Sequence, residues 1–295
     1  MMLFLLILIL FNCLPAAEAQ VTWSTSTIDG AVIQVGEYTS LALDRNGNQH
    51  ISYYDANSQK LKYVYWTGSA WSAKTTVDTT AGAGLYTSLA IDANNNPHIA
   101  YRDNTNNTLR YAYYYQSWAT TGVVVGSYSP GYFPTIAIDG SGGINIAHWS
   151  SNWGLTFSRL PNWTNDYIEG QYYYGSLALD SIGTPHIAYL GGSGYNLRYV
   201  KGKSVPGQWT TPETIQPNAS VGYYPSSVID GNGYPHIAYG ANNKLRYVKQ
   251  DLSGWNFDYA VIDDNINCAW TAIALDGNGY PHIAFYDTTN GDLKY

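Results

Sequence analysis

Cysteine and positively charged residues are scarce in this chain. Lys and Arg number only 14 in 295 residues, against 21 Asp and Glu, and the formal net charge at pH 7 is −7. Such a balance argues against a nucleic acid or an anionic membrane surface as the partner. Of the 2 cysteines, we expect Cys13 to be removed with an N-terminal signal peptide, so that Cys268 remains alone. One thiol cannot form an intrachain disulfide, and Cys268 is therefore predicted to be packed in the core.

Long apolar runs are missing after the first residues of the chain. Residues 1–19, MMLFLLILILFNCLPAAEA, form an apolar segment that ends in the small-residue pattern Ala-Glu-Ala. This pattern predicts a secretory signal peptide cleaved before Gln20, although no Lys or Arg precedes the apolar segment. A lipid anchor at Cys13 is the alternative, but the two residues before it are too large and too polar for that processing. We therefore expect a secreted protein of residues 20–295 without membrane insertion.

Tyrosine and glycine are abundant, with 29 residues each, and they occur in an internal repeat. The stretch YTSLALDRNGNQHISYYD at residues 38–55 returns as YTSLAIDANNNPHIAYRD at residues 86–103, and four further copies follow. A period of about 46 residues suits a four-stranded propeller blade, whereas the composition shows no helical periodicity. The period is measured on the Asp that ends the first strand of each copy: Asp44, Asp92, Asp139, Asp180, Asp230 and Asp276.

Each copy predicts four strands. The first resembles TSLALD and the second HIAY, with a Gly/Asn-rich hairpin turn between them, and the third resembles LKYV or LRYV. We therefore predict an all-β fold, a six-bladed β-propeller of four-stranded antiparallel blades, as a single domain over residues 20–295. The fourth strand of each blade is predicted to carry a Trp: Trp23, Trp71, Trp118, Trp163, Trp209 and Trp255.

The two ends of the chain indicate how the ring closes. Trp23 precedes the first copy, and the last copy stops at Tyr295 before any fourth strand. Both ends are explained if the N-terminal segment supplies the outer strand of the last blade, because such a closure leaves no unpaired sheet edge. Complete copies continue beyond the LKY of the third strand, so a parent protein with seven blades is the alternative.

A histidine follows the Asp by six residues in five copies. The interpretation we favour is an Asp-to-imidazole hydrogen bond across the hairpin. A residue that stabilises the blade is expected in every blade, whereas a catalytic residue is needed only once. Histidines on separate blades are too far apart to bind one metal ion, and the turns lack the Glu of an EF-hand, so we predict no metal and no cofactor. The five histidines are His50, His98, His186, His236 and His282, and Asn145 takes the position in the third copy.

An aromatic residue precedes the same Asp by six residues in every copy. These residues enter the first strand, and we expect them to surround one mouth of the central channel. There they either pack between blades or form a stacking surface for sugars, and the sequence leaves both interpretations open. They are Tyr38, Tyr86, Phe133, Tyr174, Tyr224 and Trp270.

The stretches HISYYDANSQKLKYVYWTGSAW and HIAFYDTTNGDLKY resemble the blade pattern of the six-bladed fucose-specific lectin family. In that family a strand RVYxxD, an Asn/Gly turn, a strand xIREx and a GxW follow in this order, and sialidase-like propellers are more loosely similar. The resemblance implies a sugar between neighbouring blades, held by an Arg that opens the second strand and a Glu on the third. This chain keeps neither: the five histidines stand for the Arg, and the Glu is replaced by Tyr63, Tyr111, Tyr199, Tyr247 and Tyr295.

Repeated blades with abundant aromatics predict a multivalent, lectin-like protein whose partners are glycans or glycoconjugates. A structural or adhesive module that binds surface proteins is the alternative. An enzyme is not expected, because no carboxylate pair for acid–base chemistry and no GxSxG motif is present. The three Glu that follow the signal peptide lie outside the repeat positions, and they are Glu37, Glu169 and Glu213.

Overall fold

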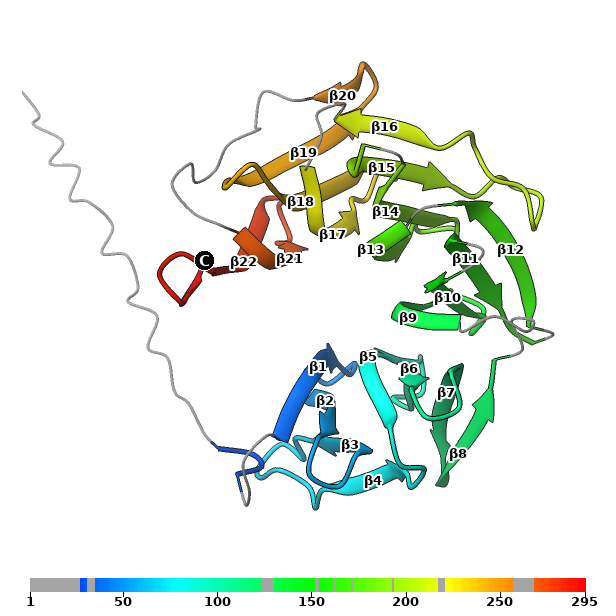
Figure 1. Cartoon of the computed structure of the whole chain (residues 1–295), viewed down its shortest axis with the longest axis vertical. Coiled ribbons are helices and arrows are strands. Elements are labelled where there is room, and N and C mark those ends of the chain that lie inside the picture. Colours follow the sequence, from blue (N-terminus) through cyan, green and yellow to red (C-terminus); the bar gives the residue numbers. More distant parts are fainter. Residues whose placement is uncertain are drawn as a thin grey trace, which may run out of the picture.

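The computed structural model describes residues 27–30, 35–123, 130–151, 154–161, 163–170, 172–192, 194–216, 221–256 and 268–295. Within these residues the chain forms 23 strands in six antiparallel sheets, which follow one another around a central axis (Figure 1). The predicted all-β, six-bladed propeller is therefore confirmed. In the described part, no helix has the length and hydropathy that a membrane span needs. The predicted signal peptide lies outside the described residues.

Each blade begins with its innermost strand and runs outward. Blade 1 contains β1 (Val35–Leu43), β2 (Gln49–Asp55), β3 (Lys60–Tyr65) and β4 (Thr75–Asp78); blade 2 contains β5 (Ala83–Ile91), β6 (Pro97–Asp103), β7 (Thr108–Tyr115) and β8 (Ser117–Gly122). Blade 3 contains β9 (Pro130–Ile138), β10 (Ile144–Ser150), β11 (Gly154–Arg159) and β12 (Thr164–Glu169); blade 4 contains β13 (Tyr172–Leu179), β14 (Pro185–Gly191), β15 (Asn196–Lys201) and β16 (Glu213–Gln216). Blade 5 contains β17 (Val221–Ile229), β18 (Pro235–Ala241), β19 (Leu245–Asp251) and β20 (Gly254–Asn256), and blade 6 contains β21 (Cys268–Leu275), β22 (Pro281–Asp287) and β23 (Asp292–Lys294).

The turn between the first two strands is organised by its Asp. In blade 1 the Asp44 carboxylate accepts hydrogen bonds from the backbone N–H groups of Asn46 and Asn48, both at 2.8 Å. A carboxylate that binds the backbone two and four residues further on replaces missing ladder bonds and stabilises a tight turn. The same arrangement recurs at Asp92, Asp139, Asp180, Asp230 and Asp276.

The hydrophobic core is a series of clusters between neighbouring blades. Between blades 1 and 2, Leu61 and Tyr63 of β3 pack with Leu89 of β5 and with Ile99 and Tyr101 of β6. Blades 2 to 5 are thus covered on both faces, which explains why their inner strands are almost wholly apolar. The predicted core position of the cysteine is confirmed, since Cys268 is buried in the cluster that joins blades 5 and 6.

The fourth strand begins later than predicted in three blades. Trp71 and Trp209 form only isolated bridges ahead of β4 and β16, and Trp163 directly precedes β12. In two of these blades the cause is a side-chain hydroxyl. The hydroxyls of Ser72 and Thr210 accept hydrogen bonds from backbone amides of the third strand, and in a regular sheet a backbone carbonyl of the fourth strand would accept them. In the other two described blades the Trp lies within the predicted strand, as Trp118 in β8 and Trp255 in β20.

At several blade junctions the outer end of one blade is fastened to the next blade by a hydrogen bond that we call the inter-blade latch. The carboxylate of Asp78, at the end of β4, accepts a hydrogen bond from the hydroxyl of Tyr101 on β6 at 2.6 Å. The carboxylate of Asp29 accepts a hydrogen bond from the hydroxyl of Tyr53 on β2 at 2.7 Å. Asp29 of the N-terminal segment therefore has the same position relative to blade 1 as Asp78 of β4 has relative to blade 2. The same latch is formed by Glu169 with Tyr189 and by Gln216 with Tyr239.

Blades 1 and 6 each present a face that the described residues leave open. Leu41 and Leu43 on β1 are 63% and 59% exposed, whereas Leu89, the counterpart of Leu41 on β5, is 7% exposed. Blade 6 has three described strands. The fourth strand predicted around Trp23 lies outside the described residues, so the closure by the N-terminal segment stays a prediction beyond the position of Asp29.

Candidate functional site

The predicted histidines and tyrosines meet within each blade. His98 Nδ1 lies 2.5 Å from the hydroxyl oxygen of Tyr111, and its Nε2 lies 3.4 Å from the carboxylate of Asp92. The Asp-to-imidazole contact that the sequence predicts is thus present, and it continues to a tyrosine on the third strand. The same chain of three groups joins His50 to Tyr63, His186 to Tyr199, His236 to Tyr247 and His282 to Tyr295.

In blades 2 and 4, burial favours the uncharged form of the imidazole. It lowers the pKa of His98, and it lowers that of His186 to about 4, while the neighbouring carboxylate opposes the shift only in part. Burial also raises the pKa of Tyr111. A neutral imidazole donates from one nitrogen and accepts at the other, so Nε2–H faces the Asp and Nδ1 accepts the tyrosine proton. These side chains therefore contact one another inside the blade, and their role as ligand contacts stays a prediction.

Blade 3 replaces both partners of this chain. Asn145 occupies the position of the histidine, and Phe157, which has no hydroxyl, occupies the position of the tyrosine. The Asn145 carbonyl oxygen instead accepts a hydrogen bond from Arg159 Nε at 2.8 Å. The repeat spacing predicts Asn145 at this position, whereas Phe157 and Arg159 were not predicted, because the spacing between the two hairpin positions in blade 3 differs from that in most blades and only the strand register aligns them.

Three clefts lie at equivalent positions between neighbouring blades, and we call them the inter-blade clefts. Their volumes are about 670 Å³ between blades 1 and 2, about 870 Å³ between blades 2 and 3, and about 520 Å³ between blades 3 and 4. One wall is formed by the third-strand aromatic of the first blade. The other is formed by the first hairpin turn and the Trp of the next blade. Cavities of this size accommodate small ligands.

An edge-to-face pair of aromatic rings builds each cleft. The ring of Tyr63 lies 5.0 Å from that of Trp118, with an angle of 71° between the planes. The corresponding pairs are Tyr111 with Trp163 at 5.6 Å and Phe157 with Trp209 at 4.9 Å. This is a favoured aromatic geometry, and since the two rings come from different blades, blade packing itself forms the cleft.

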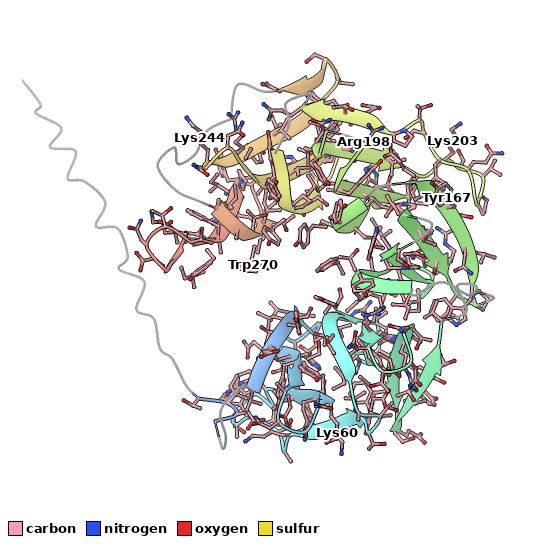
Figure 2. The ribbon with its side chains drawn as sticks, viewed as in Figure 1. Lys60, Tyr167, Arg198, Lys203, Lys244 and Trp270 are labelled. Carbon is pink, nitrogen blue, oxygen red and sulfur yellow. The ribbon has the colours of Figure 1, made fainter. Side chains whose placement is uncertain are left out.

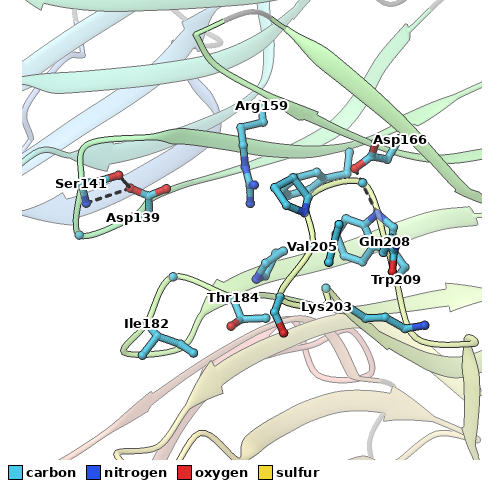
Figure 3. A pocket seen from close by; sticks show the side chains of 18 of the residues that line it. Asp139, Ser141, Arg159, Asp166, Ile182, Thr184, Lys203, Val205, Gln208 and Trp209 are labelled. Atoms are coloured by element: carbon cyan, nitrogen blue, oxygen red, sulfur yellow. Dashed lines mark hydrogen bonds between the residues drawn. The ribbon is translucent and has the colours of Figure 1, made fainter.

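The cleft between blades 3 and 4 is lined by the most charged residues (Figure 3): Asp166 and Lys203 line it alone, whereas Asp139 and Arg159 also line the cleft between blades 2 and 3. Arg159 extends into the space between Asp139 on one side and Trp209 on the other. Its guanidinium carbon lies 5.5 Å from the centre of the Phe157 ring. The Trp209 indole N–H donates to Asp166 at 3.2 Å. This cleft therefore combines a fixed cation, carboxylates and aromatic faces. In the part of the chain that is described, no cluster of three or more His, Cys, Asp or Glu forms a metal site.

The second group of predicted residues lies elsewhere, around one mouth of the central channel, and we call it the axial collar. Its six rings contact one another in sequence, with centroid distances of 4.5, 4.6, 4.6, 4.3 and 5.0 Å from Tyr38 to Trp270. The predicted location is confirmed, and so is packing between blades. The collar surrounds a cavity of about 910 Å³. Its members are Tyr38, Tyr86, Phe133, Tyr174, Tyr224 and Trp270.

No protein-family model and no curated protein sequence matches the chain. Solved structures do match. A lectin from Aleuria aurantia in complex with Fucα1-6GlcNAc is 16% identical, with a TM-score of 0.58, over 89% of this chain and 91% of the lectin. The NanB sialidase from Streptococcus pneumoniae is 10% identical, with a TM-score of 0.64, over 92% of this chain and 68% of the sialidase. An intramolecular trans-sialidase from Ruminococcus gnavus is 10% identical, with a TM-score of 0.60, over 87% and 91%. At these identities the comparisons show a shared propeller fold, as the predicted resemblance to lectin and sialidase-like propellers requires.

Proposed function

We propose that this protein is a secreted, multivalent glycan-binding propeller without catalytic activity, and that its sugars bind in the inter-blade clefts. The observation that carries the proposal is the repetition of one cleft, with an aromatic wall facing a polar turn, at three blade junctions. A sugar ring needs both an apolar surface for its C–H face and hydrogen-bond partners for its hydroxyls, and such a cleft offers both. Secretion rests on the N-terminal sequence.

The polar side chains of the clefts supply the hydrogen-bond partners in this proposal. Asn95 and Tyr65 line the first cleft, and Ser141 lines the second and the third. In the second and third clefts, on either side of blade 3, Arg159 adds a donor that is already oriented by Asn145. Blade 3 is thus the specialised blade, and the two clefts beside it are expected to differ from the first in sugar preference. Repeated weak sites on one chain give high avidity for a surface that displays many copies of a glycan.

The positions of the glutamates support the absence of catalysis. Glu169 is paired with Arg198 at 2.9 Å and closes a latch, and Glu213 accepts the indole N–H of Trp255 at 3.0 Å. The described residues that line the three clefts include no Glu. A glycosidase of the usual kind needs two free carboxyl groups that flank one bond. The third cleft contains Asp139 and Asp166, but Asp139 accepts hydrogen bonds from its own turn and Asp166 accepts the indole N–H of Trp209.

Trp163→Leu is expected to reduce the number of bound sugars by one per chain, because Trp163 forms a wall of the cleft between blades 2 and 3 alone. The number is counted by native mass spectrometry with methyl α-L-fucoside, methyl β-galactoside and sialyllactose as probes. Trp163→Phe keeps an aromatic wall and should retain the site. Tyr280→Ser is the matched control, since Tyr280 is an exposed aromatic on a turn of blade 6. An unchanged count in folded Trp163→Leu would contradict the location of the sites.

A further inference from the structure

The axial collar is a built feature that the inter-blade clefts do not use. Five of its six residues have a left-handed backbone, with φ of 53° at Tyr38, 55° at Tyr86, 48° at Phe133, 47° at Tyr224 and 48° at Trp270. A left-handed conformation costs a residue with a side chain roughly 1–2 kcal/mol. Backbone strain of this kind clusters at ligand-binding positions.

A β-bulge at each of these positions sets the direction of the ring. In blade 2 the register between β5 and β6 shifts between Leu85 and Ser88, on either side of Tyr86. Strict alternation along a strand would place successive side chains on opposite faces of the blade. The bulge instead brings the ring to the channel mouth, where it meets the rings of both neighbouring blades. Figure 2 shows Trp270 on the inner side of the ring of blades, with Lys60, Lys203 and Lys244 towards the outside.

The wall below the rings offers few directional hydrogen-bonding groups. The Thr87 hydroxyl donates to the carbonyl of Tyr38 at 2.8 Å, and the Thr271 hydroxyl donates to the carbonyl of Tyr224 at 2.7 Å. Thr39 takes the same place in blade 1, and Pro134, Gly175 and Pro225 take it in blades 3, 4 and 5, while Thr135 also lines the cavity. The hydroxyls of Thr87 and Thr271 are already engaged, and three of the six equivalent wall positions carry no side-chain hydrogen-bonding group, so the wall offers a sugar few free partners.

The charge of the cavity favours a cation. Glu37 is the only charged residue among the described residues that line it. The faces of aromatic rings carry negative potential, and a cation within about 6 Å of a ring centre is attracted to it. Tyr38 and Trp270, which belong to the two blades with an open face, keep 41% and 61% of their surface exposed.

We infer that the axial collar binds an organic cation of the quaternary ammonium type. Its methyl groups lie against the ring faces, it needs no hydrogen-bond partners, and Glu37 balances its charge at the rim. A cavity of about 910 Å³ holds a molecule of the size of choline. This site is separate from the inter-blade clefts, and it does not depend on the proposed glycan binding.

The test uses the whole protein and two probes of the same shape. Choline carries the charge, and 3,3-dimethylbutan-1-ol replaces its nitrogen by carbon. Isothermal titration calorimetry is expected to show choline binding about ten-fold or more tightly than the alcohol. Tyr224→Leu should weaken choline binding about five-fold, and Tyr224→Phe, which keeps the ring, should not. Glu37→Gln should also weaken it, whereas Asp251→Asn, which neutralises an exposed carboxylate of blade 5, should not.

Three results would overturn the inference. Equal affinity for the two probes would show an apolar cavity without preference for charge, and no binding of choline by the folded protein would show that the collar only packs. Displacement of choline by a sugar that the protein binds would assign the collar to glycans. Trp163→Leu separates this site from the glycan proposal, because it alters an inter-blade cleft and is expected to leave choline binding unchanged.

Discussion

Gly84→Ala is expected to lower the free energy of unfolding by roughly 3 kcal/mol or more. Gly84 lies at the start of β5 with a φ of +116°, a conformation that side chains rarely adopt. A Cβ built there would lie 2.8 Å from the Cα and 2.9 Å from the amide nitrogen of Leu61. These are backbone atoms of blade 1, so the clash can be relieved only by moving the two blades apart, which also widens the first inter-blade cleft.

Gly36→Ala is the matched control for this substitution. Gly36 occupies the same repeat position in blade 1 and has a similar φ of +92°, but a Cβ there meets no atom within 4 Å. Only the conformational cost of about 1 kcal/mol is expected. Both variants are compared with the wild type by urea unfolding at pH 7. Equal losses for Gly36→Ala and Gly84→Ala would indicate that a neighbouring blade also packs against Gly36, as the predicted closure of the ring requires. A loss of only about 1 kcal/mol in Gly84→Ala would contradict the clash with Leu61.

Asp78→Ala is expected to cost roughly 3 kcal/mol, because it breaks an inter-blade latch. Asp78 is 5% exposed and accepts hydrogen bonds from Tyr101 at 2.6 Å and from the Thr80 amide at 2.9 Å. Its carboxylate also lies 3.3 Å from Arg110 Nε. Alanine leaves the hydroxyl of the fully buried Tyr101 without its acceptor. Urea unfolding measures the loss.

The pH dependence distinguishes a lost carboxylate from a lost packing contact. Burial alone raises the pKa of Asp78, but hydrogen bonds from Tyr101 and Thr80 outweigh it, and the net pKa lies below the ordinary value of 3.8. The contribution of the Asp78 carboxylate to the free energy of unfolding is therefore complete above pH 3.8 and is lost as the pH falls further. The free energies of unfolding of wild type and Asp78→Ala should thus converge in acid. Asp78→Asn should cost less, because the neutral Gln216 forms the same latch with Tyr239. An equal loss in both variants at every pH would contradict the latch.

Much of the fold follows from local chemistry that the repeat makes visible. The Asp, Asn and Gly of each first turn predict a tight hairpin, and the structure shows the Asp carboxylate binding the turn amides. The start of the fourth strand could not be predicted, because hydroxyls such as that of Ser72 interrupt the ladder before β4. An interruption of this kind depends on strand register, which composition does not report.

The candidate sites were predictable only in part. The position of the axial collar followed from its spacing, since an aromatic before every first strand must lie near the axis of a propeller. The inter-blade clefts could not be predicted from the repeat spacing, because each cleft pairs a ring such as Tyr111 with a Trp about 50 residues further along the chain. Phe157 and Arg159 escaped notice because the hairpin of blade 3 has a different length, so a fixed spacing does not align them with Tyr111 and Tyr113.

The most direct test of the central claim is a glycan-array screen of the labelled, folded protein. We expect binding to a coherent class of sugars, with an apparent affinity that rises with glycan density on the array because several clefts engage at once. Silence across the array from a monodisperse sample would contradict glycan binding, and the repeated clefts would then be a consequence of blade packing alone.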